Sequence, residues 1–335
     1  MARTTFVVCT RNNVDIIDRV LDGIEAQTDA DWRAVCVDDA STDGTAERVA
    51  ERGPRFQVIR RRSPMGPSIN RNEAIQSTSS EFVAFLDSDV ELDARWLEAT
   101  AGCLDRRPDV GVVGGKLLYF ANPGHLNSYG GEIGRIGIAW DGMDGEPADK
   151  AREPRDCLWV CSAAMLARRS VLEEIGLFDP TYFYGYEDSD VGWRAVLAGH
   201  RCVCVPDAIA FHRARTTIGG MGEGITFHYH KNRVRSMIKN LGFARLAAHF
   251  PLYLAYSVVD LLARGPRRAK LRAWGWQLAH LPETLRLRKI IQKGRRKADS
   301  EIAHLFSPRF FPPTPLARRG RFRIPGALTH GAAPP

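Results

Sequence analysis

This sequence lacks the cysteine patterns that cross-link small domains through disulfide bonds or zinc. Its seven cysteines are an odd number, and no two of them are spaced as Cys-x-x-Cys. Disulfide frameworks and cysteine-based zinc sites need paired or regularly spaced cysteines, so we expect the reduced, buried thiols of an intracellular protein. A signal peptide is not visible either, because Arg3 leads directly into a predicted strand and then into polar sequence.

Acidic residues are scarce in one part of the chain. Residues 264–297 contain 12 Lys and Arg but a single Glu, whereas residues 1–263 contain 30 Lys and Arg against 36 Asp and Glu. An acidic body followed by a strongly basic segment predicts a negatively charged partner for that segment.

A long apolar run is also missing from residues 241–300, which include this basic segment. The longest uncharged run of residues 241–300 is Leu246–Val259, and a histidine and a proline interrupt it. A membrane-spanning helix needs about 20 apolar residues. We therefore predict amphipathic helices lying on an anionic membrane surface, with cations at the headgroups and Trp274 and Trp276 at the boundary. Nucleic acid is the alternative partner, but no nucleic-acid-binding motif accompanies the segment, and we expect none.

The first half of the chain alternates strand-like and helix-like segments. Overall 44% of the residues are hydrophobic and 26% are charged, which is typical of a globular protein with a sizeable core. Strands separated by helical segments predict an α/β fold with a mainly parallel, Rossmann-like sheet and helices on both faces. The predicted strands are Thr4–Thr10, Trp32–Ser41, residues 56–61 and residues 81–89; the predicted helices are residues 14–27, 43–53 and 68–78.

Polar side chains follow the predicted strands at the points where they end. The three clusters are Thr10–Asn13, Asp38–Ser41 and Asp87–Asp89. Ligands of such sheets bind beyond the carboxyl ends of the strands, so these clusters should converge on one crevice. Two carboxylates one residue apart suit a hard divalent cation and the phosphate oxygens that it carries. Taken alone, an Asp-x-Asp triplet is equally typical of a solvated turn.

Four motifs in order resemble the inverting family 2 glycosyltransferases with the GT-A fold. They are "VDDASTDGT", "NRNEAI", "FLDSD" and "FDPTYFYGYEDSDVGWRA", and the resemblance covers about residues 4–240. Composition and charge predict a basic, amphipathic helical extension over residues 241–300 and an irregular Pro/Arg-rich tail over residues 301–335. The resemblance implies a GT-A glycosyltransferase domain over residues 1–240. It also implies a nucleoside-diphosphate sugar as donor and Mn²⁺ or Mg²⁺ as cofactor.

The resemblance assigns the donor side of the site. Asp39 looks like the carboxylate that accepts the N3–H of a uracil or thymine base, with Thr10 and Asn12 lining the same pocket. Arg71 looks like the cationic residue near the base and diphosphate, and Gly66 lets the chain pass close by.

The resemblance also assigns the metal ligands. Asp87 would contact the ribose or a metal-bound water, Asp89 would bind the metal, and His212 matches a histidine that is a metal ligand in many relatives. Residues 213–224, rich in arginine and glycine, would form a lid over the diphosphate.

The second half of the resemblance supplies a catalytic base. Inverting transfer needs a carboxylate that removes a proton from the attacking acceptor hydroxyl. Asp188 is the leading candidate, with Glu187 as the alternative. The aromatic residues Tyr184, Tyr186 and Trp159 look like a wall on which the acceptor or donor sugar stacks. Asp190, in the first turn of the following predicted helix, is explained by the helix dipole.

Together these features predict a metal-dependent inverting glycosyltransferase. Its sequence looks most like bacterial rhamnosyltransferase-type enzymes of surface polysaccharide assembly. The donor would be dTDP-rhamnose or a UDP-hexose, and the acceptor a glycan or a lipid-linked glycan. The expected location is the cytoplasmic, inner face of the cell membrane. The alternatives are a sugar-nucleotide nucleotidyltransferase and a non-catalytic sugar-nucleotide-binding scaffold. The oligomeric state is not predicted.

Overall fold

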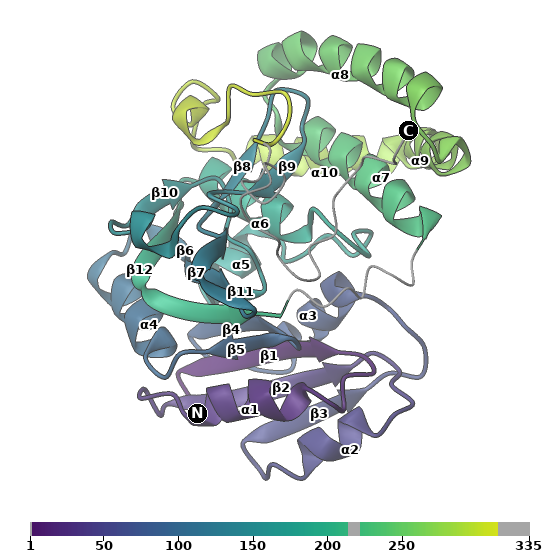
Figure 1. Cartoon of the computed structure of the whole chain (residues 1–335). Coiled ribbons are helices and arrows are strands. Elements are labelled where there is room, and N and C mark those ends of the chain that lie inside the picture. Colours follow the sequence, from purple (N-terminus) through teal and green to yellow (C-terminus); the bar gives the residue numbers. More distant parts are fainter. Residues whose placement is uncertain (1, 214–221, 314–335) are drawn as a thin grey trace.

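A computed structural model describes residues 2–213 and 222–313 of the chain. Figure 1 shows an α/β body built on a twisted sheet, with a layer of helices, α7 to α10, at the opposite end from β1 to β3. The strands are β1 (Thr4–Thr10), β2 (Trp32–Asp38), β3 (Phe56–Arg60), β4 (Phe82–Asp87), β5 (Val90–Leu92), β6 (Val110–Tyr119), β7 (Asn122–Ser128), β8 (Gly131–Ile133), β9 (Ala139–Asp141), β10 (Arg155–Cys157), β11 (Ala164–Arg168) and β12 (Arg201–His212).

The first three helices match the predicted helical segments, residues 14–27, 43–53 and 68–78. The helices are α1 (Ile17–Glu25), α2 (Thr45–Ala50), α3 (Pro67–Gln76), α4 (Trp96–Arg106), α5 (Arg169–Ile175), α6 (Glu187–Leu197), α7 (Glu223–Asn240), α8 (Phe243–Ala263), α9 (Arg267–Ala279) and α10 (Leu281–Lys293), with 3-10 turns at Ala148–Lys150 and Ala303–Leu305. In α1 the buried residues Ile17, Val20, Leu21 and Ile24 lie on one face, as helical spacing requires.

The order of strands in the main sheet is β10-β12-β6-β11-β4-β1-β2-β3. Strands β4, β1, β2 and β3 run parallel, and β11 runs antiparallel between β4 and β6. The mainly parallel sheet is thus confirmed. In register, Thr10 lies opposite Asp38 and Cys9 opposite Asp87, so the ends of β1, β2 and β4 meet at one edge.

The core has two parts, one on each face of the sheet. On β4, Val83 and Phe85 belong to one buried cluster, and Phe82, Ala84 and Leu86 belong to the other. A strand covered on both faces must be apolar at successive positions. This explains why Phe82–Leu86 is a continuous apolar run that ends in carboxylates.

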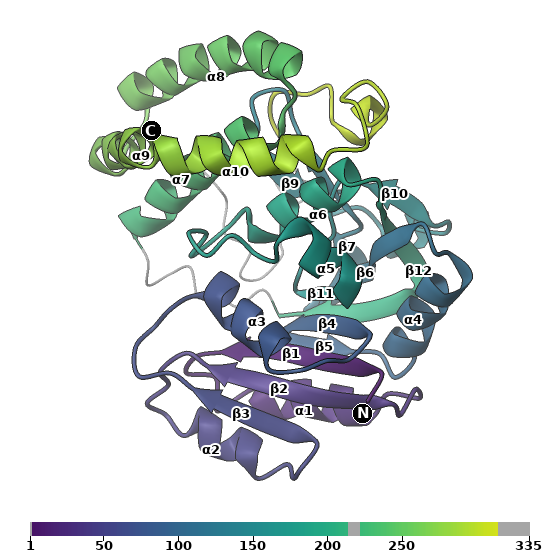
Figure 2. The same ribbon diagram turned by 180° about the vertical axis from the view of Figure 1, so that it is seen from behind.

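Helices α9 and α10 pack on α7 and are not separate from the body. The Arg288 guanidinium donates to the carbonyl oxygens of Ile238 (2.5 Å) and Leu241 (2.6 Å), and Gln277 donates to that of Lys231. Figure 2, seen from behind, shows α10 lying in front of α7. The predicted helical extension is confirmed. It is not a separate appendage, because its helices cover α7, which ends just before residue 241.

The two tryptophans of the extension face other helices. The Trp274 ring lies 5.8 Å from that of Tyr253 on α8, and Nζ of Lys231 on α7 lies 4.6 Å from the centre of the Trp276 ring. Both tryptophans are half-buried. Their role at a membrane boundary stays a prediction, because these contacts leave each ring partly exposed.

Helix α8 is longer than the uncharged run that the sequence offered. It has 21 residues with a mean hydropathy of 1.4 over its most apolar window, and 17% of that window is buried. By length and composition alone such a helix can cross a membrane, which corrects the expectation that the run is too short. Its buried residues are Tyr253, Ser257 and Asp260, all with polar groups.

Candidate active site

The residues predicted to line the nucleotide pocket gather where β1 and β2 end. The backbone N–H of Asp39 donates to the carbonyl oxygen of Thr10 (2.8 Å). Asn12 follows in a left-handed conformation, φ +52°, and its Oδ1 accepts the N–H of Thr42 (2.9 Å). The structure therefore brings Thr10, Asn12 and Asp39 together at the edge of the sheet where the sequence placed them.

Asp39 also holds the loop that leads into α3. Its carboxylate accepts the backbone N–H groups of Met65 (2.7 Å) and Gly66 (3.1 Å). Gly66 has φ +82°, and a Cβ there would lie 2.7 Å from the Phe183 ring. Both the backbone conformation and the close ring require glycine at this position. A contact between Asp39 and a base stays a prediction.

Arg71 turns into the protein, between two acidic motifs. Its side chain is 4% exposed, with Nη2 2.9 Å from Oδ1 of Asp87 and Nη1 3.7 Å from Oε1 of Glu187. The guanidinium also lies over the Phe178 ring, 5.4 Å from its centre. The sequence placed Arg71 beside the nucleotide; in the structure its buried guanidinium lies between the carboxylates of Asp87 and Glu187.

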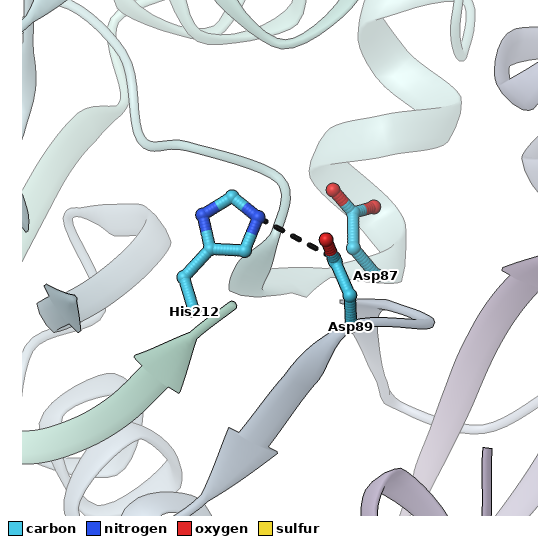
Figure 3. Close-up of side chains that lie close together, drawn as sticks. All are labelled: Asp87, Asp89 and His212. Carbon is cyan, nitrogen blue, oxygen red and sulfur yellow. Dashed lines mark ion pairs between the residues drawn. The ribbon is translucent and has the colours of Figure 1, made fainter. Parts of the chain in front are cut away.

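The three predicted metal ligands converge, although they come from distant segments (Figure 3). Asp87 ends β4, Asp89 lies just before β5, and His212 ends β12. Strand β5 pairs with β12, with Val90 opposite His212. One ligand atom from each of Asp87, Asp89 and His212 lies within 4.8 Å of the others, and all three residues are half-buried. Two carboxylates and an imidazole fit Mn²⁺ well, and they leave positions open for phosphate oxygens.

Asn127 fixes the orientation of the His212 ring. Its Nδ1 lies 2.7 Å from the amide oxygen of Asn127, which can only accept, while Nε2 lies 3.3 Å from Oδ1 of Asp89. Nδ1 therefore carries a proton, and Nε2 faces the carboxylates as a metal ligand would. Burial lowers the pKa of His212, but the interaction with Asp89 outweighs burial and raises that pKa overall. A divalent cation would replace this proton on Nε2.

Glu187 and Asp188 begin α6, close to the metal-side motif. The Asp188 carboxylate accepts the N–H groups of Ser189 (2.7 Å) and Ser162 (3.3 Å), which fix its position. Burial, followed by repulsion from Asp188, raises the pKa of Glu187 to about 7. Burial also raises the pKa of Asp188. Carboxylates with raised pKa values are suited to accept a proton near neutral pH.

The predicted aromatic wall is largely internal. Tyr186 is 6% and Trp159 5% exposed. The Tyr186 hydroxyl donates to the carbonyl oxygen of Gly137 (3.0 Å), and a Cβ on Gly131 would enter the Trp159 ring at 1.9 Å. These two rings are packing elements beneath the site, which corrects the expectation that a sugar stacks on them. Tyr184 is half-buried against Tyr229, with ring centres 5.9 Å apart.

Asp190 is held by an ion-pair network, not by the helix dipole alone. It is 0% exposed; its carboxylate is 2.8 Å from Nε of Arg194 and 3.0 Å from Nζ of Lys239, and it accepts a hydrogen bond from Asn240. Lys239 also pairs with Asp179 (2.7 Å). Burial raises the pKa of Asp190, but Lys239 and Arg194 outweigh it and hold that pKa below its usual value. The network fixes α6 against α7.

Sequence reasoning missed three residues that shape the site. Asn127 orients His212, Lys239 anchors α6, and Asp141 on β9 lies near both Asp188 and His212, with which its charge interacts. None belongs to a recognisable motif. Asp141 lies in "AWDGMDGE", which has neither strand alternation nor helical spacing. Of the predicted lid, residues 214–221 lie outside the described part of the chain, as do residues 314–335 of the tail.

A family model and several known proteins match this chain. The model described as glycosyl transferase family 2 matches residues 5–176. The pre-mycofactocin glycosyltransferase of Mycobacterium tuberculosis is 28% identical over 219 residues, or 64% of this chain. The N-acetylglucosaminyl-diphospho-decaprenol L-rhamnosyltransferase of the same species is 24% identical over 288 residues, which are 76% of this chain and 92% of that protein. The chain spans only 43% of the pre-mycofactocin glycosyltransferase.

Solved structures share the fold. GalNAc-T7 with UDP, GalNAc and Mn²⁺ has a TM-score of 0.67 at 16% identity, over 90% of this chain and 57% of that one. The mannosyltransferase PcManGT from Pyrobaculum calidifontis, in complex with GDP-Man and Mn²⁺, has a TM-score of 0.52 at 21% identity, over 87% and 85%. At these identities the likeness shows the fold, and the predicted GT-A architecture is confirmed.

Proposed function

The chain belongs to glycosyl transferase family 2 and is a glycosyltransferase, and we propose that it moves a sugar, with inversion, from a nucleoside diphosphate to an acceptor hydroxyl in a metal-dependent reaction. One observation carries the proposal. Asp87, Asp89 and His212 converge within 4.8 Å, and Arg71 bridges Asp87 to Glu187, the neighbour of Asp188. A cation-binding group and a proton-accepting pair thus lie on two sides of one site.

The proposed division of labour follows from this geometry. Asp89, His212 and the outer oxygen of Asp87 would hold Mn²⁺ or Mg²⁺, which when bound neutralises charge on the leaving diphosphate. Asp188 accepts the proton of the attacking hydroxyl, because two N–H groups orient its carboxylate. Glu187 is the alternative base. Arg71 holds a positive charge between the two carboxylate groups, and it limits their repulsion.

For the substrates, the rhamnosyltransferase relative supports a coarse choice. Its name specifies an L-rhamnosyl group and a lipid-linked diphospho-sugar acceptor, and the match covers 92% of its length. We propose a dTDP-rhamnose or UDP-hexose donor, with Thr10, Asn12 and Asp39 near the base, and a glycan or lipid-linked acceptor of cell-surface polysaccharide synthesis. A nucleotidyltransferase finds no support among these relatives.

The outer face of α8 supports a membrane as partner. Every exposed residue of this helix is apolar: Phe243, Ala244, Ala247, Ala248, Pro251, Leu252, Leu254, Ala255, Val258, Val259, Leu262 and Ala263. Four exposed arginines follow, at positions 264, 267, 268 and 272. An apolar stripe beside cations fits an anionic bilayer. Asp260, buried at the inner side of α8, is 2.6 Å from Nζ of Lys270 and 3.5 Å from Nε2 of His230. We propose that these contacts keep α8 on the protein, lying in the inner face of the cell membrane.

The donor test uses isothermal calorimetry with dTDP-rhamnose, UDP-glucose and GDP-mannose, each with and without Mn²⁺. The wild type is expected to bind one of these nucleotide sugars far more tightly with Mn²⁺, and Asp89→Ala to lose that dependence while unfolding at the wild-type temperature. Asp207→Ala removes an exposed carboxylate from β12, the strand that carries His212, and serves as the control. Unchanged Mn²⁺-dependent affinity in Asp89→Ala would rule out the metal assignment.

The membrane test uses substitutions, because deletion after residue 240 would strip α7 of its packing. Full-length protein should sediment with phosphatidylglycerol–phosphatidylcholine vesicles at low salt and less at high salt. Val258→Glu with Leu262→Glu should release it. Gln57→Glu, on exposed β3 at the other end of the molecule, should not. Wild-type protein that stays in the supernatant at low salt would refute the membrane proposal.

A further inference from the structure

Asp141 lies on a hairpin that is fastened to the acceptor-side motif. Strands β8 and β9 pair, with Gly131 opposite Asp141. The Gly131 N–H donates to the carbonyl oxygen of Trp159 (2.8 Å), and the Tyr186 hydroxyl, one residue before Glu187, accepts the N–H of Ala139 (3.3 Å). Asp141 is therefore held at a fixed place relative to the start of α6.

One oxygen of Asp141 has no partner. Its Oδ1 is shielded from solvent and accepts no hydrogen bond from any residue that the structure describes. Asp144, three residues on, is different, because the Tyr119 hydroxyl donates to its Oδ1. A buried carboxylate oxygen without a donor is destabilising, and such groups in native structures call for an explanation. Burial raises the pKa of Asp141 to about 7; a hydrogen bond with Ser128 opposes this rise, and repulsion from Asp188 and Asp144 adds to it.

The proximity of Asp141 to two other groups suggests the explanation. Its carboxylate interacts electrostatically with Asp188 and with His212. In an in-line displacement, the leaving diphosphate lies at the metal ligands and the attacking hydroxyl lies at the base. The transferred sugar must then lie between them, close to Asp141, whose carboxylate is near enough to both Asp188 and His212 to interact with them.

We infer that the free Oδ1 of Asp141 accepts a hydrogen bond from a hydroxyl of the transferred sugar and so helps to select the donor. The inference rests on the proposed function, since it deepens the assignment of the same site. A carboxylate repels other anions, so Asp141 favours neutral hexoses or deoxyhexoses over sugars that carry their own carboxylate, such as uronic acids.

The first experiment separates the sugar from the nucleotide. With Mn²⁺ present, calorimetry compares the wild type with Asp141→Asn, using the bound nucleotide sugar and the matching nucleoside diphosphate. Replacing a charged acceptor by a neutral one should weaken nucleotide-sugar binding about tenfold, while the affinity for the nucleoside diphosphate stays the same. Asp144→Asn is the matched control, because its carboxylate is already bonded to Tyr119, and it should leave both affinities unchanged.

A second experiment identifies the hydroxyl. Monodeoxy versions of the donor sugar form a cycle with Asp141→Asn, in which a shared contact shows as non-additive loss. One deoxy donor should bind the wild type and the variant equally well. Thermal unfolding of Asp141→Asn should occur at or above the wild-type temperature, because the change removes an unfavourable buried charge.

The outcomes distinguish this inference from the proposed function. If the wild type binds no nucleotide sugar with Mn²⁺, the proposed function fails and the inference fails with it. If the wild type binds and Asp141→Asn binds the nucleotide sugar equally tightly, only the role of Asp141 is overturned. A rise in the KM for acceptor alone, with donor affinity unchanged, would also overturn it, by placing Asp141 at the acceptor.

Discussion

Asp188 and Asp190, separated by one residue on α6, should respond differently to the same substitution. Asp190 is buried among Lys239, Arg194 and Asn240, so its charge stabilises the fold. Asp188 is held by two backbone N–H groups, and burial raises its pKa. Asp190→Asn should therefore lower stability, whereas Asp188→Asn should lower activity.

The magnitude for Asp190→Asn follows from its contacts. Breaking a buried ion pair by removing one partner costs about 3–5 kcal/mol. Lys239 keeps Asp179 at 2.7 Å, and Arg194 keeps the carbonyl oxygens of Ile175 and Leu177, so the lower end applies. With about 2.1 cal/mol/K of unfolding entropy per residue, a 335-residue chain loses about 4 °C in Tm for about 3 kcal/mol.

The assay is thermal unfolding at pH 8, together with nucleoside-diphosphate release during transfer from the donor identified by calorimetry. Asp188→Asn should unfold at or above the wild-type temperature, bind donor normally and transfer sugar about 10²- to 10⁴-fold more slowly. A wild-type Tm for Asp190→Asn would show that the network does not hold α6. Near-normal turnover in Asp188→Asn, with Glu187→Gln inactive, would move the base to Glu187; normal turnover in both would refute the mechanism.

Two further predictions concern Glu187 and Asn127. The folded-state pKa of Glu187, about 7 against an ordinary 4.5, means that the wild type loses stability relative to Glu187→Gln as pH rises from about 4.5 to 7, by up to about 3 kcal/mol; parallel unfolding curves for the two proteins across this range would contradict the raised pKa. Asn127→Ala should weaken Mn²⁺ binding about 10- to 100-fold by freeing the His212 ring, measured by calorimetry with Asn122→Ala as a control on the same strand.

Short stretches of sequence were enough to predict those site residues whose place depends only on where their own strand or helix ends or begins. Thr10, Asp39 and Asp87 follow apolar strands, and parallel strands bring their ends together whatever the rest of the chain does. The start of α6 at Glu187 was likewise visible from its acidic first turn. The contacts between these residues were not visible in the sequence. That the Arg71 side chain points into the protein, for example, follows only from its contacts with the rings of Phe85 and Phe178.

The helical layer, α7 to α10, also shows what the sequence could not predict. Apolar periodicity predicted helices in residues 241–300 but not which face of each helix points outward. In α8 the polar residues Tyr253, Ser257 and Asp260 face inward, because Lys270 and His230 provide partners for Asp260 there. The tryptophans are half-buried for a similar reason, since Tyr253 packs against Trp274 and Lys231 lies over the Trp276 ring. Such pairings depend on tertiary contacts that no short stretch of sequence encodes.

The pairing of β5 with β12 makes metal affinity a measure of how far folding has progressed. A chain emerging from the ribosome can form β1 to β4, and so place Asp87 and Asp89, long before β12 exists. Until His212 lies opposite Val90, the cation meets two carboxylates without an imidazole and is expected to bind weakly. Tight Mn²⁺ binding should therefore appear late in refolding, together with this long-range strand pairing, and Mn²⁺ should in turn favour the completed sheet by mass action.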